Sequence, residues 1–478
     1  MNTVRAIARS TLILFVGHII TIVLSYLCTV FTARHLGTEG FGILSFAIAF
    51  TGISCLLSDL GFSVLITREV SRNYSLAGKY IGNVLLIKMI LTVFTLGFTA
   101  VVVNPLVYPF QTAIVVYFIT LATILTSFKN VFYSIFQALQ KMEYITIGNI
   151  IYNVLLFAGT IIAINRNLEI ILFASVYFLA SLLSLGYSIY ICSGKFVIPK
   201  IEFDLPFWKN LLKESIPFWM TSVFVVIYFR MDMIMLSMIK GNEAVGWYAA
   251  AYRLIDGLSF IPTVLMTVMF PIFSSCYVDS KASLELAFEK SLKFLTIVTI
   301  PIGVGTTILA DEIIMIFYGS EYMPSATALK ILIWANVLCF IDWTPSTLLN
   351  STNRQKPLMI FTFIGVILNL VLNYILIPLW SYQGAGIATV ITELVVGLLM
   401  LSYIQKTHNL LALLIDVISR SLISAVVMGI FVWIFKDYML ILLVPLASIF
   451  YFCSLVMING IKKDDLKILN QALKDKSG

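Results

Sequence analysis

Four charged side chains lie inside long apolar stretches of this sequence, where a charge is costly. Arg230 and Asp232 stand near the end of one stretch, and Arg253 and Asp256 stand within the next. A charge at the centre of a membrane costs about 3 kcal/mol or more, so such residues pair with one another or line a water-filled path. The segment 228–256, which holds all four, is therefore the first candidate for a functional site.

The spacing of these charges predicts which way they face. Arg230 and Asp232 are two residues apart, about 200° around a helix, so they face opposite sides. We expect Arg230 to face a central cavity and Asp232 to point into the packed second half of the protein. Arg253 and Asp256 are three residues apart and share one helix face, where a local ion pair and a cavity lining both remain open interpretations.

Two lysines, Lys88 and Lys129, also fall inside apolar stretches. Neither has an acidic residue within one turn of its own predicted helix. Each lysine either extends its ammonium group to the cytoplasmic surface or contacts a substrate. Together with the arginines, these cations outnumber the acids near them, a balance typical of a site for an anionic cargo such as a diphosphate.

A second group of polar residues has the chemistry to bind a cation. Oxygen-bearing side chains occur on three predicted spans, namely Asp232, Asn369, Asn373, Thr389 and Glu393. The two asparagines share one helix face, and so do the last two residues, because the members of each pair are one turn apart. Oxygen ligands gathered in a membrane suit Na⁺ or a proton, and hydrogen bonds that hold helices together are the other open interpretation.

The elements that position these residues are predicted to be membrane-spanning helices. Of the 478 residues, 60% are hydrophobic and 12% are charged, whereas soluble proteins carry about 25% charged residues. Apolar runs near 20 residues predict fourteen spans. These are 11–33, 41–66, 80–103, 112–137, 145–164, 169–192, 213–239, 246–272, 291–310, 326–349, 358–379, 384–404, 416–436 and 439–459. The six cysteines form no CxxC pair and the three histidines are dispersed, so no metal cluster is expected.

The distribution of Lys and Arg predicts the orientation in the membrane. With the N-terminus in the cytoplasm, 22 of the 31 Lys and Arg residues fall in cytoplasmic segments and four fall outside. Such an excess on the inner side is typical of membrane proteins. It also explains the net charge of +7 without a nucleic-acid partner. We expect a multi-pass protein of the cytoplasmic membrane, with both termini in the cytoplasm.

The chain also contains an internal repeat. The turn GTEGFG at 37–42 resembles KGNEAVG at 240–246, 204 residues later, and a pair of asparagines one turn apart occurs in both the fifth and the eleventh spans. Six spans precede the second copy, so the halves are predicted to be parallel, with the working site between them. We predict an all-α integral membrane fold with an N-lobe at 1–195, a cytoplasmic linker at 196–212, a C-lobe at 213–405, two further helices at 406–460 and a cytoplasmic tail at 461–478.

Signals for an enzyme are weak. No predicted outer loop is long, the longest lying near 311–325, and neither a Gly-rich phosphate loop nor a Walker-type lysine occurs. ATP is therefore not the expected energy source, and the chain is not expected to be an enzyme.

Three parts of the sequence resemble a known family. They are ARHLGTEGFG (33–42), RMDMIML…GWYAAAYRL (230–254), and YGSEYMPSATALKIL (318–332) followed by LLNSTNRQKPLMIFTFIGVILNLVLNYILIPLWSYQGAGIATVITE (348–393). Over nearly its whole length the chain resembles polysaccharide (Wzx-type) flippases, whose superfamily also holds multidrug and toxin extrusion antiporters and lipid II flippases. The resemblance implies two six-helix lobes around a central cavity, two extra helices, and export of undecaprenyl- or dolichyl-diphosphate-linked oligosaccharides by alternating access.

The resemblance also implies a cation site. In the lipid II flippase branch, sodium is held by an Asp on helix seven, two residues one turn apart on helix eleven, and a carbonyl and a Thr on helix twelve. The matching positions here are Asp232, Asn369, Asn373, Ala385 and Thr389. That branch has a carboxylate where this chain has Asn373, so weaker cation binding is expected. Na⁺ and a proton are the alternative ligands, and no other cofactor is expected.

The leading hypothesis is therefore a flippase that moves polyprenyl-diphosphate-linked oligosaccharide units for surface polysaccharide biosynthesis. Its expected substrate-binding residues are Arg230, Arg253, Arg34, Lys88, Lys129 and Asp256. Arg34, near the outer mouth, is either a substrate ligand or an anchor for lipid headgroups. A cation-coupled multidrug antiporter is the alternative, and it would need a cavity rich in carboxylates. A membrane glycosyltransferase or polymerase is disfavoured by the short outer loops. The expected partners are the lipid-linked glycan, membrane lipid and polysaccharide assembly proteins, with the chain itself a monomer.

Overall fold

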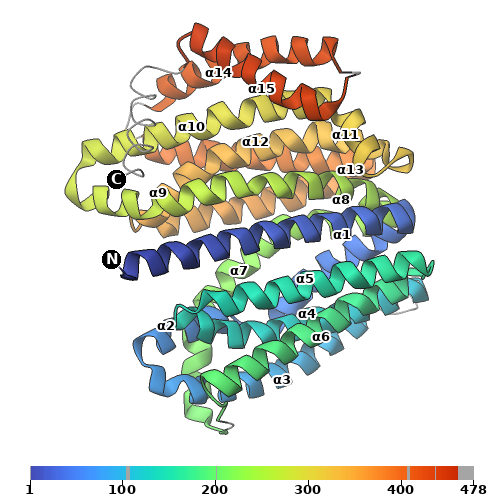
Figure 1. Cartoon of the computed structure of the whole chain (residues 1–478), viewed down its shortest axis with the longest axis vertical. Coiled ribbons are helices and arrows are strands. Elements are labelled where there is room, and N and C mark those ends of the chain that lie inside the picture. Colours follow the sequence, from blue (N-terminus) through green and yellow to red (C-terminus); the bar gives the residue numbers. More distant parts are fainter. Residues whose placement is uncertain (1, 104–107, 201, 406–409, 437, 461–478) are drawn as a thin grey trace. The chain divides into compact units, whose positions relative to one another are not determined.

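The described residues of the computed structural model, 2–103, 108–200, 202–405, 410–436 and 438–460, form helices joined by short turns and contain no strand (Figure 1). The predicted tail at 461–478 and the start of the predicted 406–460 segment lie outside these residues. The helices are α1 (Asn2–Ser54), α2 (Phe62–Arg72), α3 (Ala77–Val102), α4 (Phe110–Ala138), α5 (Met142–Asn165), α6 (Ile170–Lys195), α7 (Leu205–Lys240), α8 (Asn242–Asp256), α9 (Phe260–Asp279), α10 (Lys281–Ile308), α11 (Ala310–Phe317), α12 (Pro324–Ser351), α13 (Gln355–Gln405), α14 (Leu410–Ile434) and α15 (Leu440–Met457).

Membrane-spanning helices dominate the fold. Within the described ranges, ten helical segments are long and apolar enough to cross a membrane, and Leu442–Met457 is a shorter apolar helix. The prediction of a multi-pass membrane protein is therefore confirmed. Two of these segments contain a residue with non-helical backbone angles, Gly37 in α1 and Ser381 in α13. Both lie in connections that the sequence predicts between spans, and the number of fourteen spans stays a prediction.

The chain packs as two compact units, Met1–Ala249 and Ala250–Gly478. The first unit includes α7, which packs against α1 and α2. For example, the indole of Trp219 on α7 donates a hydrogen bond of 2.8 Å to the carbonyl of Leu56. These two units are defined by how the helices pack, whereas the predicted lobes are defined by the internal sequence repeat. The predicted lobe boundaries therefore stay predictions.

The repeat is visible in the backbone of the turns. Three pairs of turn residues occupy the left-handed region of backbone space at corresponding places in the two halves. They are Gly37 (φ 69°) and Gly241 (φ 87°), Gln140 (φ 57°) and Asn353 (φ 59°), and Asn167 (φ 48°) and Ser381 (φ 52°). Such angles are uncommon for residues other than glycine. This recurrence fits the predicted duplication, whose extent stays a prediction.

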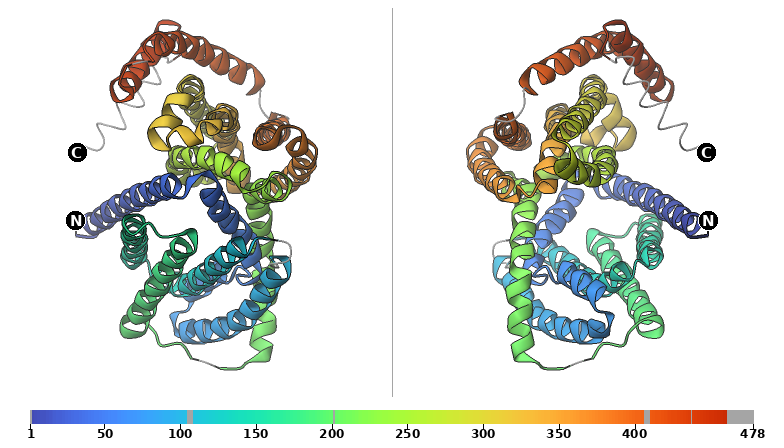
Figure 2. Two further views of the ribbon diagram at one scale, coloured as in Figure 1. Left: turned by 90° about the vertical axis from the view of Figure 1, so that its right-hand side faces the viewer. Right: turned by 90° about the vertical axis from the view of Figure 1, so that its left-hand side faces the viewer.

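The two repeated hairpins contact each other within the first unit. At Gly37, α1 bends into two arms (Figure 2). A Cβ added at Gly42 would collide with the backbone carbonyl of Asn242, and a Cβ added at Gly246 would collide with that of Thr38. Residues 38 and 242 correspond in the repeat, as do residues 42 and 246. The contact is therefore reciprocal, as expected for a two-fold relation.

A short 3-10 turn interrupts the second helical segment of each repeat. In the first repeat the helix ends at Ser54 and is followed by η1 (Cys55–Leu57). In the second repeat α8 ends at Asp256 and is followed by η3 (Gly257–Ser259). The predicted span 246–272 is thus broken rather than continuous. Breaks of this kind within membrane segments commonly mark binding sites in transporters.

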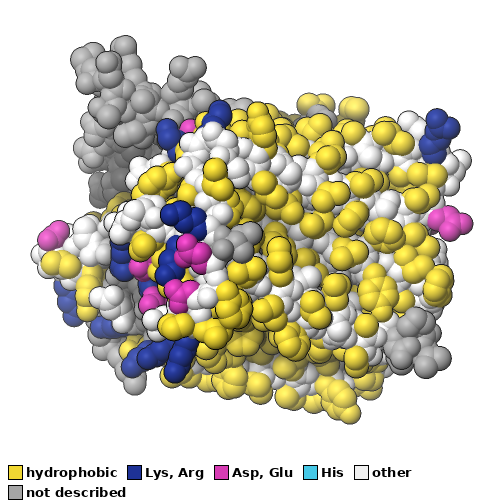
Figure 3. Space-filling model, turned by 90° about the horizontal axis from the view of Figure 1, so that it is seen from below, with side chains coloured by type: hydrophobic (Ala, Val, Ile, Leu, Met, Phe, Trp, Pro, Cys, Tyr) yellow, Lys and Arg dark blue, Asp and Glu magenta, His cyan; other side chains and the backbone are white. Residues whose placement is uncertain are grey.

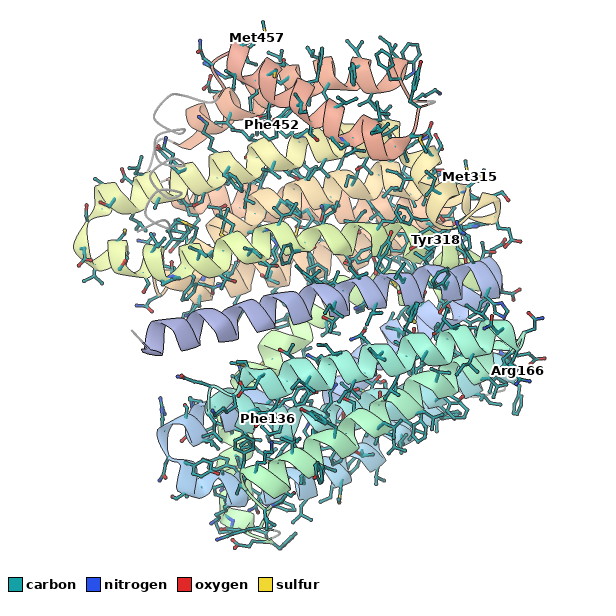
Figure 4. All side chains as sticks on the ribbon, viewed as in Figure 1. Phe136, Arg166, Met315, Tyr318, Phe452 and Met457 are labelled. Carbon is teal, nitrogen blue, oxygen red and sulfur yellow. The ribbon has the colours of Figure 1, made fainter. Side chains whose placement is uncertain are left out.

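Charged side chains gather at one end of the face shown in Figure 3, and hydrophobic side chains cover most of the rest. Phe136 and Arg166 lie at opposite ends of the helices in the first unit (Figure 4).

Asp204 caps α7 by accepting a hydrogen bond of 3.0 Å from the amide of Phe207. Its carboxylate also pairs with Lys79 at 2.7 Å, and these two interactions hold the pKa of Asp204 below its ordinary value.

Candidate functional site

Lys88 on α3 is completely buried inside the first unit. Its ammonium group donates to the carbonyl of Ser127 at 2.9 Å and to the hydroxyl of the same residue on α4. It also forms an ion pair of 3.4 Å with Asp59, which follows η1. The ammonium group therefore does not extend to the surface, which was one of the two interpretations from sequence. Spacing along α3 could not reveal this pairing because the acid comes from another element.

Lys129 on α4 is only 5% exposed. Its Nζ lies 5.1 Å from the centre of the Tyr133 ring and 5.2 Å from that of Tyr152 on α5. Among the described residues it has no hydrogen bond or ion pair with an acidic side chain. Aromatic rings stabilise a cation without neutralising it. Within the described residues, Lys129 is therefore a buried base with aromatic neighbours and no acidic partner.

Arg230 on α7 is partly buried, and its aliphatic stem passes Gly52 of α1, where an added Cβ would lie 3.9 Å from Cγ. In the part of the chain that the structure describes, Arg230 forms no ion pair with Asp232 or any other acid. The two residues indeed differ in environment, because Asp232 is only 3% exposed. The predicted role of Arg230 in a substrate cavity stays a prediction.

Asp232 is held inside the first unit by two hydrogen bonds. Its carboxylate accepts one from the hydroxyl of Tyr248 on α8 and one of 2.8 Å from the amide of Met233. A buried carboxylate is acceptable when its oxygens are satisfied in this way. Tyr248 was not singled out by the sequence, because its role depends on α8 folding back beside α7.

The other four residues of the predicted cation site lie in the second unit, all on α13. Asn373 donates to Asn369 Oδ1 at 2.8 Å, and Thr389 donates to the carbonyl of Ala385 at 3.0 Å. Each of these oxygens keeps at least one free lone pair, and Asn373 Oδ1 is buried without a described partner. An unsatisfied buried oxygen suits a cation or a proton donor. Whether Asp232 joins this set stays a prediction.

The remaining predicted substrate residues lie at helix ends. Arg253 is partly buried near the end of α8, and Asp256 is exposed at its last residue, beside the 3-10 break. Arg34 is exposed one turn before the bend at Gly37. These positions fit access from water, which a binding residue needs.

The structure also shows a buried acid, Asp342, that the sequence pattern above did not single out. Asp342 on α12 is 8% exposed and lies against the backbone of Gly397 on α13, one turn after Glu393, which is 7% exposed. Asp342 is an acid within a predicted apolar span, the same signal that identified Asp232.

An apolar groove of about 400 Å³ lies in the second unit, lined by α10, α14 and α15 together with Leu258. Its lining includes Pro301, Val432, Val444 and Phe452, with Ser448 among its few polar groups. A groove of this composition fits an acyl or prenyl chain better than a polar solute.

Comparisons with known proteins agree with this architecture. The profile of the family described as polysaccharide biosynthesis protein matches residues 7–276, and that of MatE matches residues 217–375. The chain is 24% identical over 406 residues to the probable low-salt glycan biosynthesis flippase Agl15 of Haloferax volcanii, covering 84% of each chain. It is 23% identical over 422 residues to a putative O-antigen transporter of Escherichia coli, covering 86% of this chain and 100% of that one.

Solved structures show the same fold. The lipid II flippase MurJ in an inward closed conformation superposes with a TM-score of 0.77 at 17% identity, covering 94% of this chain and 98% of that one. A multidrug resistance MATE family transporter in an inward-facing conformation superposes with a TM-score of 0.66 at 16% identity, covering 81% and 96%. At these identities the likeness concerns the fold.

Proposed function

The chain belongs to the polysaccharide biosynthesis protein family, and from that premise we propose that it is a flippase for polyprenyl-diphosphate-linked oligosaccharides. Relatives that cover most of its length are named as a glycan biosynthesis flippase and an O-antigen transporter. The cargo of such a protein has three chemical parts: an apolar chain, a diphosphate and a polar glycan. We propose binding sites for the apolar chain and for the diphosphate.

Lys129 carries the proposal, because it is a buried base with no described acidic partner. A diphosphate is the anion that every molecule of this cargo carries, and a charge-assisted contact with it would offset the cost of burying Lys129. Arg230, Arg253 and Arg34 are the further proposed ligands, and Lys88 and Asp256 complete the predicted set. Since Lys88 is already paired with Asp59, its contribution would be the weakest.

The apolar groove beside α14 and α15 is the proposed place of the prenyl chain. Its lining is almost entirely hydrophobic, and burying a methylene group contributes about 0.8 kcal/mol. A few isoprene units in this groove would hold the carrier while the glycan crosses the membrane.

The arrangement that performs this transport is proposed to be fourteen helices in two parallel six-helix lobes plus two helices, around a central cavity. The recurrence of turn geometry in the two halves supports it. Alternating access then follows from the two lobes rocking about the cavity. We further propose that the protein lies in the cytoplasmic membrane with both termini in the cytoplasm, acts as a monomer beside polysaccharide assembly proteins, and uses Asp232 and its four partners as a candidate cation site.

A cation-coupled multidrug antiporter is the second candidate, favoured by the MatE match over residues 217–375. It is distinguished by its cargo. An organic cation would be repelled by Lys129 and Arg230, whereas a lipid diphosphate would be attracted.

Complementation of a strain that lacks this gene tests the flippase proposal, with surface glycan measured by lectin binding. Arg230→Ala, Arg253→Ala and Lys129→Ala are each expected to lower glycan export strongly while the amount of folded protein stays the same. Arg72→Ala is the matched control, since Arg72 is an exposed arginine whose side chain is 68% accessible. Full export by all three variants, or efflux of ethidium without glycan export, would overturn the proposal.

A further inference from the structure

Lys129 lies inside the first unit, at a place where little stabilises a positive charge. The residue is only 5% exposed, and its Nζ lies 5.1 Å from the centre of the Tyr133 ring and 5.2 Å from that of Tyr152. Within the described ranges it forms no ion pair, and no charged side chain acts on it. The rings come from α4 and α5, so the amine has aromatic carbon where an exposed lysine has water.

The helices that pack on α4 carry few charges, and these lie elsewhere. α4 packs against α1, α2, α3, α5 and α6. Lys88 of α3 is paired with Asp59, and Glu143, the acid of α5, lies nine residues before Tyr152, about 13.5 Å along the helix. The remaining acidic and basic side chains that the structure describes on these helices lie near helix ends or near the bend in α1. The titratable groups that face Lys129 are therefore two tyrosine phenols, which are uncharged near neutral pH.

The predicted repeat indicates that the fold does not require a base at this position. Lys129 lies eleven residues before the left-handed turn at Gln140, and Asp342 lies eleven residues before the matching turn at Asn353. The same place in the repeat thus holds a base in one half and an acid in the other. A buried lysine here is therefore better explained by what it binds than by packing.

We propose that Lys129 is a neutral amine in the empty protein and binds a proton together with the diphosphate of the cargo. This role rests on the proposed flippase function, which supplies the diphosphate. Removing an ammonium group from water costs more than two aromatic faces return, so burial without an acidic partner favours the neutral amine. A diphosphate beside Nζ reverses this preference, because the charge-assisted hydrogen bond forms only with the protonated amine.

The step transfers one proton and breaks no other bond. When the diphosphate arrives, a proton from water on the side of entry forms an N–H bond with the lone pair of Nζ. When the cargo leaves on the other side, this bond breaks and the proton returns to water there. The proton offsets one negative charge of the diphosphate during the crossing, and the empty protein returns without an unpaired buried charge. An organic cation would draw no proton to Lys129, so proton uptake also distinguishes the two candidate cargoes.

Calorimetry of the purified full chain in detergent tests this proton uptake, with undecaprenyl diphosphate N-acetylglucosamine as the probe. Both phosphates of the probe are fully ionised near neutral pH, so the probe itself takes up no proton. Heats of binding measured in buffers of different ionisation enthalpy give the number of protons that enter with the probe. Above neutral pH, the wild type should take up about one proton, and its affinity should fall about tenfold for each unit of rising pH.

Two variants of Lys129 separate the proton from the charge. Lys129→Arg should bind the probe without proton uptake, because a guanidinium stays protonated in proteins. Lys129→Gln should bind the probe about 10- to 100-fold more weakly, because it loses the charge-assisted contact. Lys195→Gln is the matched control. Lys195 also lies over a tyrosine ring, 5.2 Å from the centre of Tyr144, but it is exposed at the end of α6, so this variant should behave as the wild type does.

The wild type decides the matter even if the Lys129 variants fail to fold, which thermal unfolding would reveal. Probe binding by the wild type without proton uptake would overturn the proton role of Lys129 and leave the flippase function standing. Equal proton uptake by the wild type and a folded Lys129→Arg would also overturn it, because the proton would then bind elsewhere. A wild type that binds no probe would instead refute the proposed function, and the proton role with it.

Discussion

Gly42 and Gly246, which are 204 residues apart, touch each other: a Cβ added at Gly42 would lie 3.0 Å from the amide nitrogen of Gly246. Each glycine also faces the backbone of the other hairpin, so the two copies of the repeat are joined through their turns. Because only hydrogen fits at these positions, the contact depends on glycine for space rather than for backbone angles.

Gly42→Ala is therefore expected to destabilise the protein by about 1–3 kcal/mol, the usual cost of overpacking a tight contact. Thermal unfolding in detergent measures this change. Gly97→Ala on α3 is the matched control, because a Cβ there meets nothing within 4 Å. The control should be neutral or slightly stabilising, since alanine favours a helix more than glycine does. Equal unfolding temperatures for the two variants would contradict the contact.

The ion pair of Lys88 with Asp59 predicts that substitutions at these two residues have non-additive effects on stability. Asp59→Asn leaves a buried ammonium group without its acid, and we expect a loss of about 1–3 kcal/mol of stability. Lys88→Met combined with Asp59→Asn removes both charges and should recover most of that loss. Thermal unfolding of the single and double variants gives the coupling between them. A double variant that is stable but exports no glycan would assign Lys88 to substrate binding as well.

The predicted set of cation ligands, Asp232, Asn369, Asn373, Ala385 and Thr389, leads us to expect a weak dependence on sodium. The resemblance implies a carboxylate where this chain has Asn373, so the set carries one negative charge fewer to bind Na⁺. We expect a sodium gradient to drive no more uptake than a choline gradient in proteoliposomes. Stimulation by sodium that disappears in Asp232→Asn would instead establish the five-residue sodium site.

If the prenyl chain lies in the apolar groove, a large side chain on the face of α15 that lines the groove should block transport. A large side chain on another face of α15 should not. Ser448 lines the groove, so Ser448→Trp should fill it and lower glycan export. Leu446 on the same helix is 54% exposed and does not line the groove, so Leu446→Trp should leave export near the wild-type level. Equal export by both variants would exclude the groove as the place of the prenyl chain.

The sequence alone determined the class of the protein and much of its architecture. Membrane helices can be predicted from sequence because crossing the hydrocarbon layer requires an apolar run of about 20 residues. The hairpin repeat can be recognised in the sequence because it requires glycine at fixed spacings. Glycine is needed for the left-handed turns at Gly37 and Gly241 and for the tight contact of Gly42 with Gly246. Each of these requirements concerns a short segment of the chain, so it can be predicted from the residues of that segment.

Only the tertiary structure decided which buried charges have partners. Lys88 and Lys129 look alike in sequence, but one meets Asp59 and Ser127 from other elements, and the other lies between two tyrosine rings. Likewise, Asp342 can be noticed in the sequence as an acid within an apolar span, but its position against Gly397 of α13 follows only from the packing. A buried charge is balanced or unbalanced by groups on neighbouring helices, and the identity of those neighbours follows from packing rather than from local pattern.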